Sequence, residues 1–266
     1  MSPSFTLVYI LACVAAVFGA PGTKQAFPED PEPINTVTEC GGLIDTSSAA
    51  LDFLVSGSIP AGTRCLWTVQ APYDHQRFIL TSSGLGNTSS IYLTAYSSNA
   101  EPGIQQRVTT IGQNHTIVSN VVLVTLIVSE NQIPIQQGFS LHFFSSGDAA
   151  TTTLAGHASI TAANGSFTYP AGGGQYPNDD HRLFTFARSG TPAPTIRFTR
   201  VDLESDSECS YDFIRTYVWF DNLYLQVARF CGSTIPPSFT IPDGLALLAF
   251  GSDSSVTGSG FTFEWE

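Results

Sequence analysis

The stretch that decides the fold spans residues 204–217 and reads ESDSECSYDFIRTY, followed by FCG at 230–232. Two acidic residues, Glu204 and Asp212, lie eight positions apart on either side of a cysteine. Residues 211–219 are rich in aromatic and β-branched side chains, which favour extended structure because they suit a pleated, half-buried surface. The two acids are therefore predicted to lie where a loop leads into a strand.

The same kind of sequence recurs along the chain. Short runs of Val, Ile, Phe and Thr are separated by Gly, Pro, Asn and Ser, whereas helical periodicity is scarce. This pattern is typical of sandwiches and barrels, so the predicted fold class is all-β. About 245 residues remain after a predicted leader, enough for two domains that each bury a core. The small, polar segment SGDAATTT at 146–153 predicts a linker between them.

An apolar run of twelve uncharged residues lies near the start of the chain, at 7–18. It is too short to span a bilayer and ends in small residues, so residues 1–20 are predicted to be a secretory signal peptide, cleaved after Gly19 or Ala20. The run lacks the usual basic residue at its start. Residues 21–38 are proline-rich and acidic, cannot bury enough apolar surface to fold, and are predicted to be a flexible tail.

The charge balance limits the possible partners. The chain has 22 acidic and 10 basic residues, a net charge of −12, and Lys24 is its single lysine. Nucleic acids and anionic membranes require concentrated positive charge, so neither is an expected partner, whereas a basic or metal-bridged partner fits. The sequence contains no zinc-protease, nucleophile-elbow or phosphate-loop motif, and its five histidines show no metal-ligand spacing. We therefore expect no enzymatic activity.

Five cysteines become four once Cys13 leaves with the signal peptide. An even number is typical of an oxidising compartment, and four cysteines allow three pairings. The first two and the last two are separated by more than 140 residues, which favours the local pairs Cys40–Cys65 and Cys209–Cys231.

Several motifs resemble those of the CUB domain, an extracellular β-sandwich module. They are DLE at 202–204, CSYD at 209–212 and FCG at 230–232, and the resemblance covers nearly everything from about residue 156 to the end. CGG at 40–42 and CLW at 65–67 are similar to the family's opening strands. The resemblance implies two tandem CUB-type β-sandwiches of jelly-roll-like form. A degenerate first domain spans 39–146, a linker 147–155, and a second domain 156–266.

The two predicted domains depart from the family pattern in different places. In the first, GLGN at 84–87 stands where the family has its acidic loop, so no metal site is expected there. In the second, Arg182 and Phe184 fall where the family has a cysteine and a tryptophan. Each domain would therefore keep one disulfide, and a different one.

The second domain resembles the calcium-binding subset of the family. That resemblance implies metal ligands at Glu204, Asp212 and Asp253, with Tyr176 supporting the glutamate and Ser255, or Val256, adding a backbone carbonyl. Calcium takes six to eight oxygen ligands, which carboxylates, carbonyls and water supply together. The cofactor implied is calcium.

The implied function is binding rather than catalysis. The chain resembles secreted proteins in which calcium-ordered carboxylates capture a lysine or arginine of an extracellular partner. A carbohydrate-binding protein like the spermadhesins and a structural glycoprotein of the extracellular matrix remain alternatives. The sequons at Asn87, Asn114 and Asn164 lie in polar, turn-like sequence where a glycan can be accommodated.

Overall fold

The structure is a computed structural model that describes residues 35–97, 99–131, 135–151, 153–190 and 193–266. These residues fall in one compact unit and form nineteen strands, which confirms the all-β prediction. No helix in the described part of the chain has the length and apolarity needed to cross a bilayer. The predicted signal peptide and residues 21–34 of the predicted tail lie outside the described residues.

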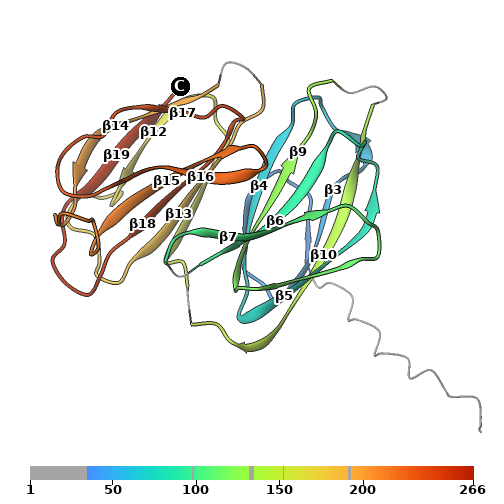
Figure 1. Ribbon diagram of the computed structural model, residues 1–266, viewed down its shortest axis with the longest axis horizontal. Helices are drawn as coiled ribbons and strands as arrows, with labels where there is room; N and C mark the ends of the chain where they lie inside the picture. Colours follow the sequence, from blue (N-terminus) through green and yellow to red (C-terminus); the bar gives the residue numbers. More distant parts are fainter. Residues whose placement is uncertain (1–34, 98, 132–134, 152, 191–192) are drawn as a thin grey trace, which may run out of the picture. The chain divides into compact units, whose positions relative to one another are not determined.

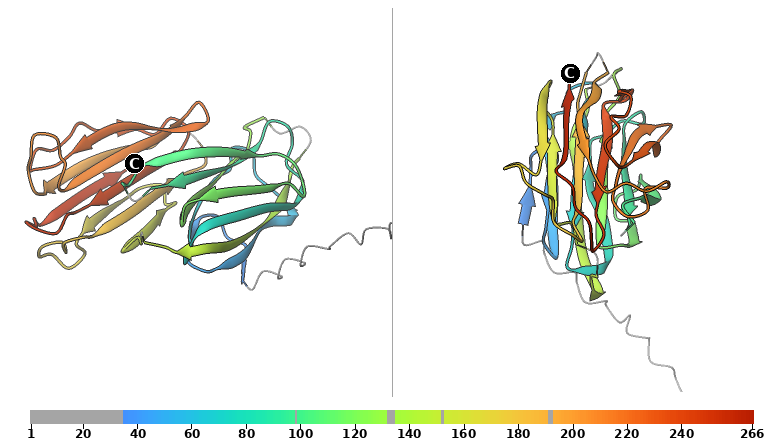
Figure 2. Two further views of the ribbon diagram at one scale, coloured as in Figure 1. Left: turned by 60° about the horizontal axis from the view of Figure 1, so that its bottom comes forward. Right: turned by 90° about the vertical axis from the view of Figure 1, so that its left-hand side faces the viewer.

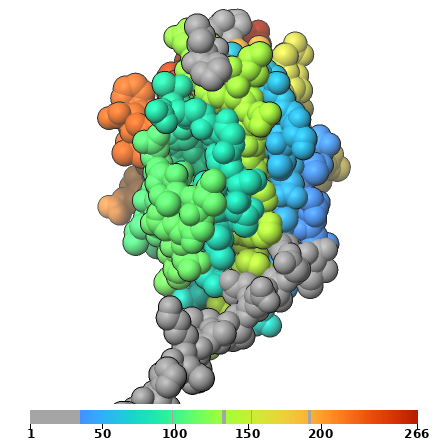
Figure 3. All heavy atoms as spheres, turned by 90° about the vertical axis from the view of Figure 1, so that its right-hand side faces the viewer, coloured from blue at the N-terminus to red at the C-terminus, as the bar shows by residue number. Residues whose placement is uncertain are grey.

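The first sandwich is built from ten strands in two five-stranded sheets, ordered β1-β3-β10-β5-β8 and β2-β4-β9-β6-β7. Figure 3 shows the first sheet face-on, from blue β1 and β3 through lime β10 to teal β5 and green β8. The strands are β1 (Asn35–Val37), β2 (Gly42–Ile44), β3 (Ser48–Ser58), β4 (Arg64–Gln70), β5 (Tyr73–Ser83), β6 (Ser90–Tyr96), β7 (Pro102–Val108), β8 (Asn114–Val118), β9 (Val121–Ile127) and β10 (Gln137–Ala149).

The second sandwich is built from nine strands, yellow to red in Figures 1 and 2. Its sheets are ordered β11-β13-β18-β15-β16 and β12-β19-β14-β17. The strands are β11 (Gly156–Ile160), β12 (Gly165–Tyr169), β13 (His181–Ala187), β14 (Thr195–Asp202), β15 (Phe213–Phe220), β16 (Leu223–Phe230), β17 (Phe239–Thr240), β18 (Leu245–Gly251) and β19 (Gly260–Trp265).

The two sandwiches have the same topology. In each, a short strand pairs in parallel with the next one of its sheet, β2 with β4 and β11 with β13, and every other pairing that these two sheets contain is antiparallel. The order β4-β9-β6-β7 then corresponds to β13-β18-β15-β16, and β3-β10-β5-β8 to β12-β19-β14-β17. Strand β1, which pairs in parallel with β3, has no described counterpart in the second sandwich. Tandem β-sandwiches, as predicted, are therefore the fold.

Each sandwich buries its own core, and a third cluster lies between them. Trp67 is central to the first core, and a group of phenylalanines that includes Phe261 fills the second. The third cluster joins side chains of both sandwiches, among them Tyr92 and Trp219, whose ring centroids lie 5.1 Å apart. Strands β9 and β18 are buried almost throughout because one face packs in a core and the other in this third cluster. Their sequences, VVLVTLI and LALLAFG, are accordingly apolar without alternation.

The strands extend beyond the predicted domain limits at two places. Asn35–Val37, within the predicted tail, forms β1 and pairs with β3. Strand β10 continues to Ala149, which pairs with Tyr73, so the start of the predicted linker belongs to a sheet. Polar sequence forms strand at both places because a neighbouring strand supplies the backbone hydrogen bonds. The domain limits themselves stay predictions.

Both predicted cysteine pairs are disulfide-bonded. Cys40 is bonded to Cys65 and Cys209 to Cys231, with Cα–Cα distances of 5.2 and 5.4 Å. One disulfide fastens the opening strands of the first sandwich, and the other lies beside the loop that carries the predicted metal ligands. The asparagines of the three sequons are all exposed, and their glycosylation stays a prediction.

Candidate metal centre

Three carboxylates meet at one end of the second sandwich. Glu204 and Asp212 lie in the loop from β14 to β15, and Asp253 follows β18. One oxygen from each lies within 4.8 Å of the others. Three residues that are up to 49 positions apart in sequence are thus brought together, because the ends of β14, β15 and β18 converge there.

Asp212 is held rigidly. It is fully buried, and its Oδ1 accepts the Asp253 backbone N–H at 2.9 Å. Its Oδ2 accepts the hydroxyl of Tyr176, a ring that is 1% exposed and packs edge-on against Phe250 at the end of β18. The Tyr176 oxygen in turn accepts the Glu204 backbone N–H at 3.0 Å. Tyr176 therefore joins the backbone of one predicted ligand to the side chain of another.

Asp253 is oriented by its own loop. Its Oδ1 accepts the Ser255 backbone N–H at 2.8 Å, and the Ser255 hydroxyl lies 3.4 Å away. The next residue, Val256, has a φ of +49°, a left-handed conformation that is uncommon for a β-branched side chain. Ser255 supports the cluster through its N–H, and a ligand role for its carbonyl or that of Val256 stays a prediction.

Glu204 is the carboxylate of the three whose oxygens have the fewest hydrogen-bond partners. Its side chain is half-buried, and its Oε2 is shielded from solvent yet has no hydrogen-bond partner. Among the described residues, no arginine, lysine or histidine forms an ion pair with any of the three carboxylates. A buried carboxylate oxygen without a partner is costly, so this arrangement calls for a cation from outside the chain.

The electrostatics agree with this deficit of positive charge. Burial, followed by repulsion from Asp253 and Asp212, raises the pKa of Glu204. Burial also raises the pKa of Asp212, although its hydrogen bonds from Tyr176 and the Asp253 backbone oppose the shift. By contrast, backbone hydrogen bonds from Ser210 and Glu208 lower the pKa of nearby Asp206. Repulsion of this kind between clustered carboxylates is relieved by a bound cation.

The donor set fits a hard divalent cation. Carboxylate oxygens are the ligands that calcium and magnesium prefer, and the loop origin of all three suits the flexible geometry of calcium. A neighbouring cluster, Asp206 with Cys209 and Cys231, does not fit a metal. Its sulfurs are joined in a disulfide and offer no thiolate.

The sequence prediction missed two arginines beside this cluster. A pocket of about 350 Å³ adjoins Asp253 and is lined by Arg215 of β15, Arg229 of β16, and Glu101 of the first sandwich. Arg215 alternates with large aromatic residues along β15, and an arginine in such a pattern signals a buried charge that needs a partner. The partner came from the other sandwich, which a single-domain pattern does not reveal.

The second sandwich is thus a two-sheet β-sandwich with a cluster of three carboxylates at one end. The CUB domain family model matches residues 156–265, the part of the chain that forms the second sandwich. The recognition of a CUB domain from the sequence motifs is confirmed.

Several known proteins are similar to the chain. Rat cubilin is 24% identical over 234 residues, which is 85% of this chain and 6% of cubilin. Human cubilin is 30% identical over 108 residues, 41% of this chain and 3% of cubilin, and Blastula protease 10 of Paracentrotus lividus is 32% identical over 117 residues, 43% of this chain and 19% of that protein. The chain thus spans only a small part of these relatives. Among solved structures, the CUB1-EGF-CUB2 domains of rat MASP-1 are 13% identical, with a TM-score of 0.37, covering 85% of this chain and 99% of theirs.

Proposed function

We propose that the chain is a secreted, non-enzymatic binding protein whose second sandwich binds calcium through Glu204, Asp212 and Asp253 and then captures a basic side chain of an extracellular partner. The observation that carries the proposal is the unpartnered, shielded Glu204 Oε2 within a cluster of three carboxylates. Solvated surface acids would have spread apart, whereas here Tyr176 and the Asp253 backbone hold Asp212 in place.

Calcium is the cation we propose because of the ligand set and the compartment. Three carboxylates on loops, completed by water or a carbonyl, give a flexible oxygen site of the calcium kind. Two disulfides support an oxidising, extracellular environment, where calcium is abundant. Bound calcium would supply two positive charges and leave a cluster of three carboxylates with one excess negative charge. That remaining charge can attract an ammonium or guanidinium group.

The partner's cation would find carboxylates that are already fixed. Asp212 is held on both oxygens, and Asp253 is held by Ser255. Side chains fixed before binding lose little entropy when the partner arrives, so a single lysine or arginine can anchor a modest interface. Lys24, the only lysine of this chain, lies in the predicted tail, so the basic group is expected to come from another protein.

A non-enzymatic role is part of the proposal. One relative, Blastula protease 10, is named as a protease, but this chain matches 19% of it. The cluster of the second sandwich consists of carboxylates held by a tyrosine and by backbone N–H groups, an arrangement that suits cation binding. Rat cubilin, whose name does not denote an enzyme, matches 85% of this chain.

The proposal is tested by calcium and lysine-peptide binding to the full chain. Titration calorimetry should show one calcium bound, and the blocked peptide acetyl-Gly-Lys-Gly-Gln-Gly-amide should perturb the NMR signals of the cluster in calcium but not in chelator. Glu204→Gln should abolish both effects. Glu208→Gln, which removes an exposed acid from the same loop, should leave both intact. Calcium binding unaffected by Glu204→Gln would remove the proposed site, and displacement of the peptide by free sugars would favour the carbohydrate alternative.

A further inference from the structure

A second charged subsite adjoins the carboxylate cluster. It is a pocket of about 350 Å³ that shares Asp253 with the cluster and is lined by residues of both sandwiches. The first sandwich contributes Asn99 and Glu101, from the turn between β6 and β7. The second contributes two arginines, Arg215 and Arg229, the ring of Phe213 and two acids, Asp179 and Asp253.

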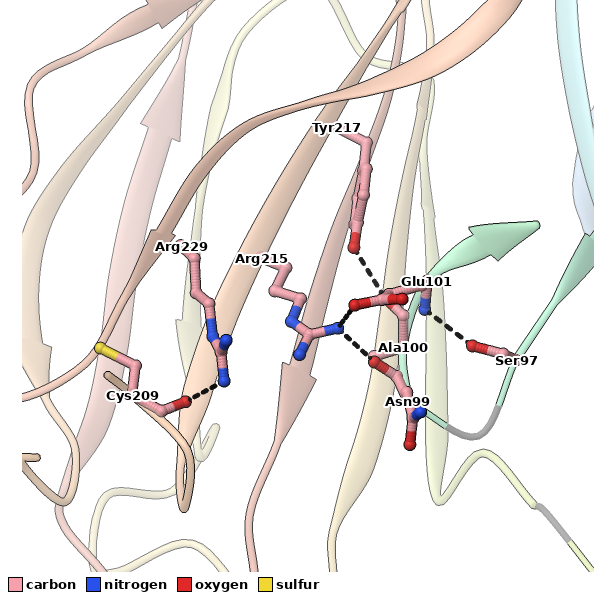
Figure 4. A network of polar contacts seen from close by, with 8 residues as sticks. All are labelled: Ser97, Asn99, Ala100, Glu101, Cys209, Arg215, Tyr217 and Arg229. Atoms are coloured by element: carbon pink, nitrogen blue, oxygen red, sulfur yellow. Dashed lines mark hydrogen bonds and ion pairs between the residues drawn. The ribbon is translucent and has the colours of Figure 1, made fainter. Parts of the chain in front are cut away.

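The pocket lies where the contact between the sandwiches ends. Tyr217 and Trp219 of β15 are buried in the cluster between the sandwiches, and the Tyr217 hydroxyl donates to the Ala100 carbonyl at 3.1 Å. Two residues earlier on the same face, Arg215 reaches the turn of the first sandwich. Its Nη1 donates to the Asn99 carbonyl at 2.6 Å and forms an ion pair with Glu101, as Figure 4 shows.

Two arginines line the pocket, and one of them is paired with Glu101. Arg215 and Arg229 stand directly opposite each other on β15 and β16, an arrangement that places like charges side by side and is destabilising. Both guanidinium groups lie over the ring of Phe213, at 4.5 and 5.7 Å from its centroid. Glu101 pairs with Arg215, whereas Arg229 forms no ion pair with any described residue and donates only to the Cys209 carbonyl, at 2.5 Å. Of the two arginines, Arg229 is thus the one that forms no ion pair within the described part of the chain, although Asp179 and Asp253 also line the pocket.

Arg215 also has a hydrogen-bond donor without a partner. The residue is 7% exposed, and its Nε is buried without a hydrogen-bond partner. An arginine presents five donors in a rigid fork that matches a carboxylate. A buried guanidinium with a free donor, beside a second guanidinium that is not engaged in an ion pair, therefore provides the chemistry of a carboxylate subsite.

We propose that this pocket binds an acidic side chain of the same partner whose basic side chain engages the metal cluster. The inference rests on the proposed function for the basic group and adds a second determinant to it. Arg215 and Arg229 line the pocket, and Asp253, which also lines it, belongs to the carboxylate cluster with Glu204 and Asp212. The complementary ligand carries an ammonium and a carboxylate close together, as a polypeptide with a lysine near a glutamate does.

The first sandwich is then part of the binding site. Glu101 holds Arg215 in place and at the same time neutralises it, so Arg229 supplies the guanidinium group that is not engaged in an ion pair. Glu101 is half exposed, with a side-chain accessibility of 52%, and its replacement should be tolerated by the fold. Removing its charge should free Arg215 for the ligand and strengthen carboxylate binding, whereas removing Arg229 should weaken it.

The test uses four blocked peptides and the full chain at millimolar calcium. Their sequence is acetyl-Gly-X-Gly-Z-Gly-amide, where X is Lys or Ser and Z is Glu or Gln, and binding is followed by NMR. The wild type should bind the Lys/Glu peptide about fivefold to tenfold more tightly than Lys/Gln, the size expected of one charge-assisted pair in a partly exposed site. Arg229→Gln should erase this preference, Glu101→Gln should increase it, and Arg197→Gln, an exposed arginine on β14, should leave it unchanged.

The outcomes separate the two proposals. Equal binding of Lys/Glu and Lys/Gln, or a preference that survives Arg229→Gln, overturns the carboxylate subsite while calcium-dependent lysine binding stands. Loss of lysine binding instead overturns the proposed function, and the Ser/Glu and Ser/Gln pair then tests the subsite alone through its dependence on Arg229. Tighter, Arg229-dependent binding of sialyllactose than of the Lys/Glu peptide would overturn the assignment of a polypeptide ligand.

Discussion

The two sandwiches share a topology but differ at the end where the second one carries its carboxylates. The loop from β5 to β6 in the first corresponds to the loop from β14 to β15 in the second, which holds Glu204 and Asp212. The first loop reads GLGNTS at 84–89 and contains no acid, whereas the second is longer and reads LESDSECSYD at 203–212. Sheet order survives this change because strand pairing depends on the strands, whereas chemistry depends on loops that a rigid scaffold positions.

The opening strands differ in a second way. In the first sandwich Cys40 is bonded to Cys65, two residues before the paired positions Gly42 and Trp67. In the second, Ala158 pairs with Phe184, and two residues earlier Gly156 pairs with Arg182. Gly156 and Arg182 therefore occupy the places of the disulfide. A Cβ at Gly156 would collide with the Arg182 guanidinium, so the glycine makes room for the arginine.

Arg182 belongs to a polar cluster at the place where the first sandwich has its disulfide. Its Nε donates to Asp180 Oδ2 at 2.8 Å, and its guanidinium lies 4.4 Å over the ring of Tyr169, whose hydroxyl also donates to Asp180. Asp180 is 2% exposed. The ion pair is local, but Tyr169 of β12 contacts both of its members, so the segment that lacks its disulfide is fastened by more than packing and backbone hydrogen bonds.

The largest expected effect tests whether the sandwiches unfold together. Trp219 is 2% exposed and lies between Tyr92 of the first sandwich and Tyr224. Trp219→Ala should cost about 3 kcal/mol, since it leaves a large cavity in the cluster that joins the sandwiches. Calorimetry should show the single transition of the wild type split into two. Phe220→Ala, at an exposed neighbour, should cost less than about 1 kcal/mol. An unsplit transition for Trp219→Ala would contradict the coupling.

The second prediction compares the ion pair at the place of the missing disulfide with an ion pair on the surface. Arg182→Ala should destabilise the protein by about 2 kcal/mol, because it leaves the buried Asp180 carboxylate without its counterion. Arg197→Ala removes an ion pair with Glu264 that is exposed on both sides and should cost less than about 0.5 kcal/mol. Urea denaturation measures both. Equal losses of stability in the two variants would show that the Arg182 ion pair stabilises the fold no more than an exposed ion pair does.

The parts that the sequence predicts are those set by local pattern. Strands and disulfides follow from short-range alternation and spacing, and the three acids follow from motifs that match a known family. The contact between the sandwiches could not be predicted in this way. The run LALLAFG at 245–251 has the length of a buried strand, but one sequence does not say which surface covers its outer face. Arg215 and Glu101 meet across 114 positions and two domains, which no local rule anticipates.

The third prediction tests whether the loops of the second sandwich, and not those of the first, bind calcium. Calcium at ten times its dissociation constant should stabilise the wild type by about 1.4 kcal/mol and raise its melting temperature by a few degrees. Asp212→Asn keeps the shape of the side chain but should abolish this shift, since it removes a ligand charge. Asp45→Asn, an exposed acid of the first sandwich, should retain it. A full calcium shift in Asp212→Asn, or its loss in Asp45→Asn, would show that the second sandwich is not where calcium binds.

The last prediction concerns His157 of β11, whose Nε2 lies 3.0 Å from the Thr68 hydroxyl of the first sandwich and 3.3 Å from that of Thr185. Burial lowers the pKa of His157 to about 4. The unfolded chain takes up this proton below about pH 6.5, while the folded chain keeps the ring neutral, so stability is complete above that pH and falls as the pH drops toward 4.

Between about pH 7 and pH 5 the loss attributable to His157 should be about 1–2 kcal/mol. Burial also lowers the pKa of His115, which contributes in the same direction, so the informative quantity is the difference between the wild type and His157→Gln. Glutamine can still hydrogen-bond to Thr68 but does not titrate, and its denaturation midpoint should therefore fall less on acidification. His142→Gln, on β10 of the first sandwich, should follow the wild type. If His157→Gln loses stability with acid as steeply as the wild type, the contact of β11 with the first sandwich does not depend on a neutral histidine.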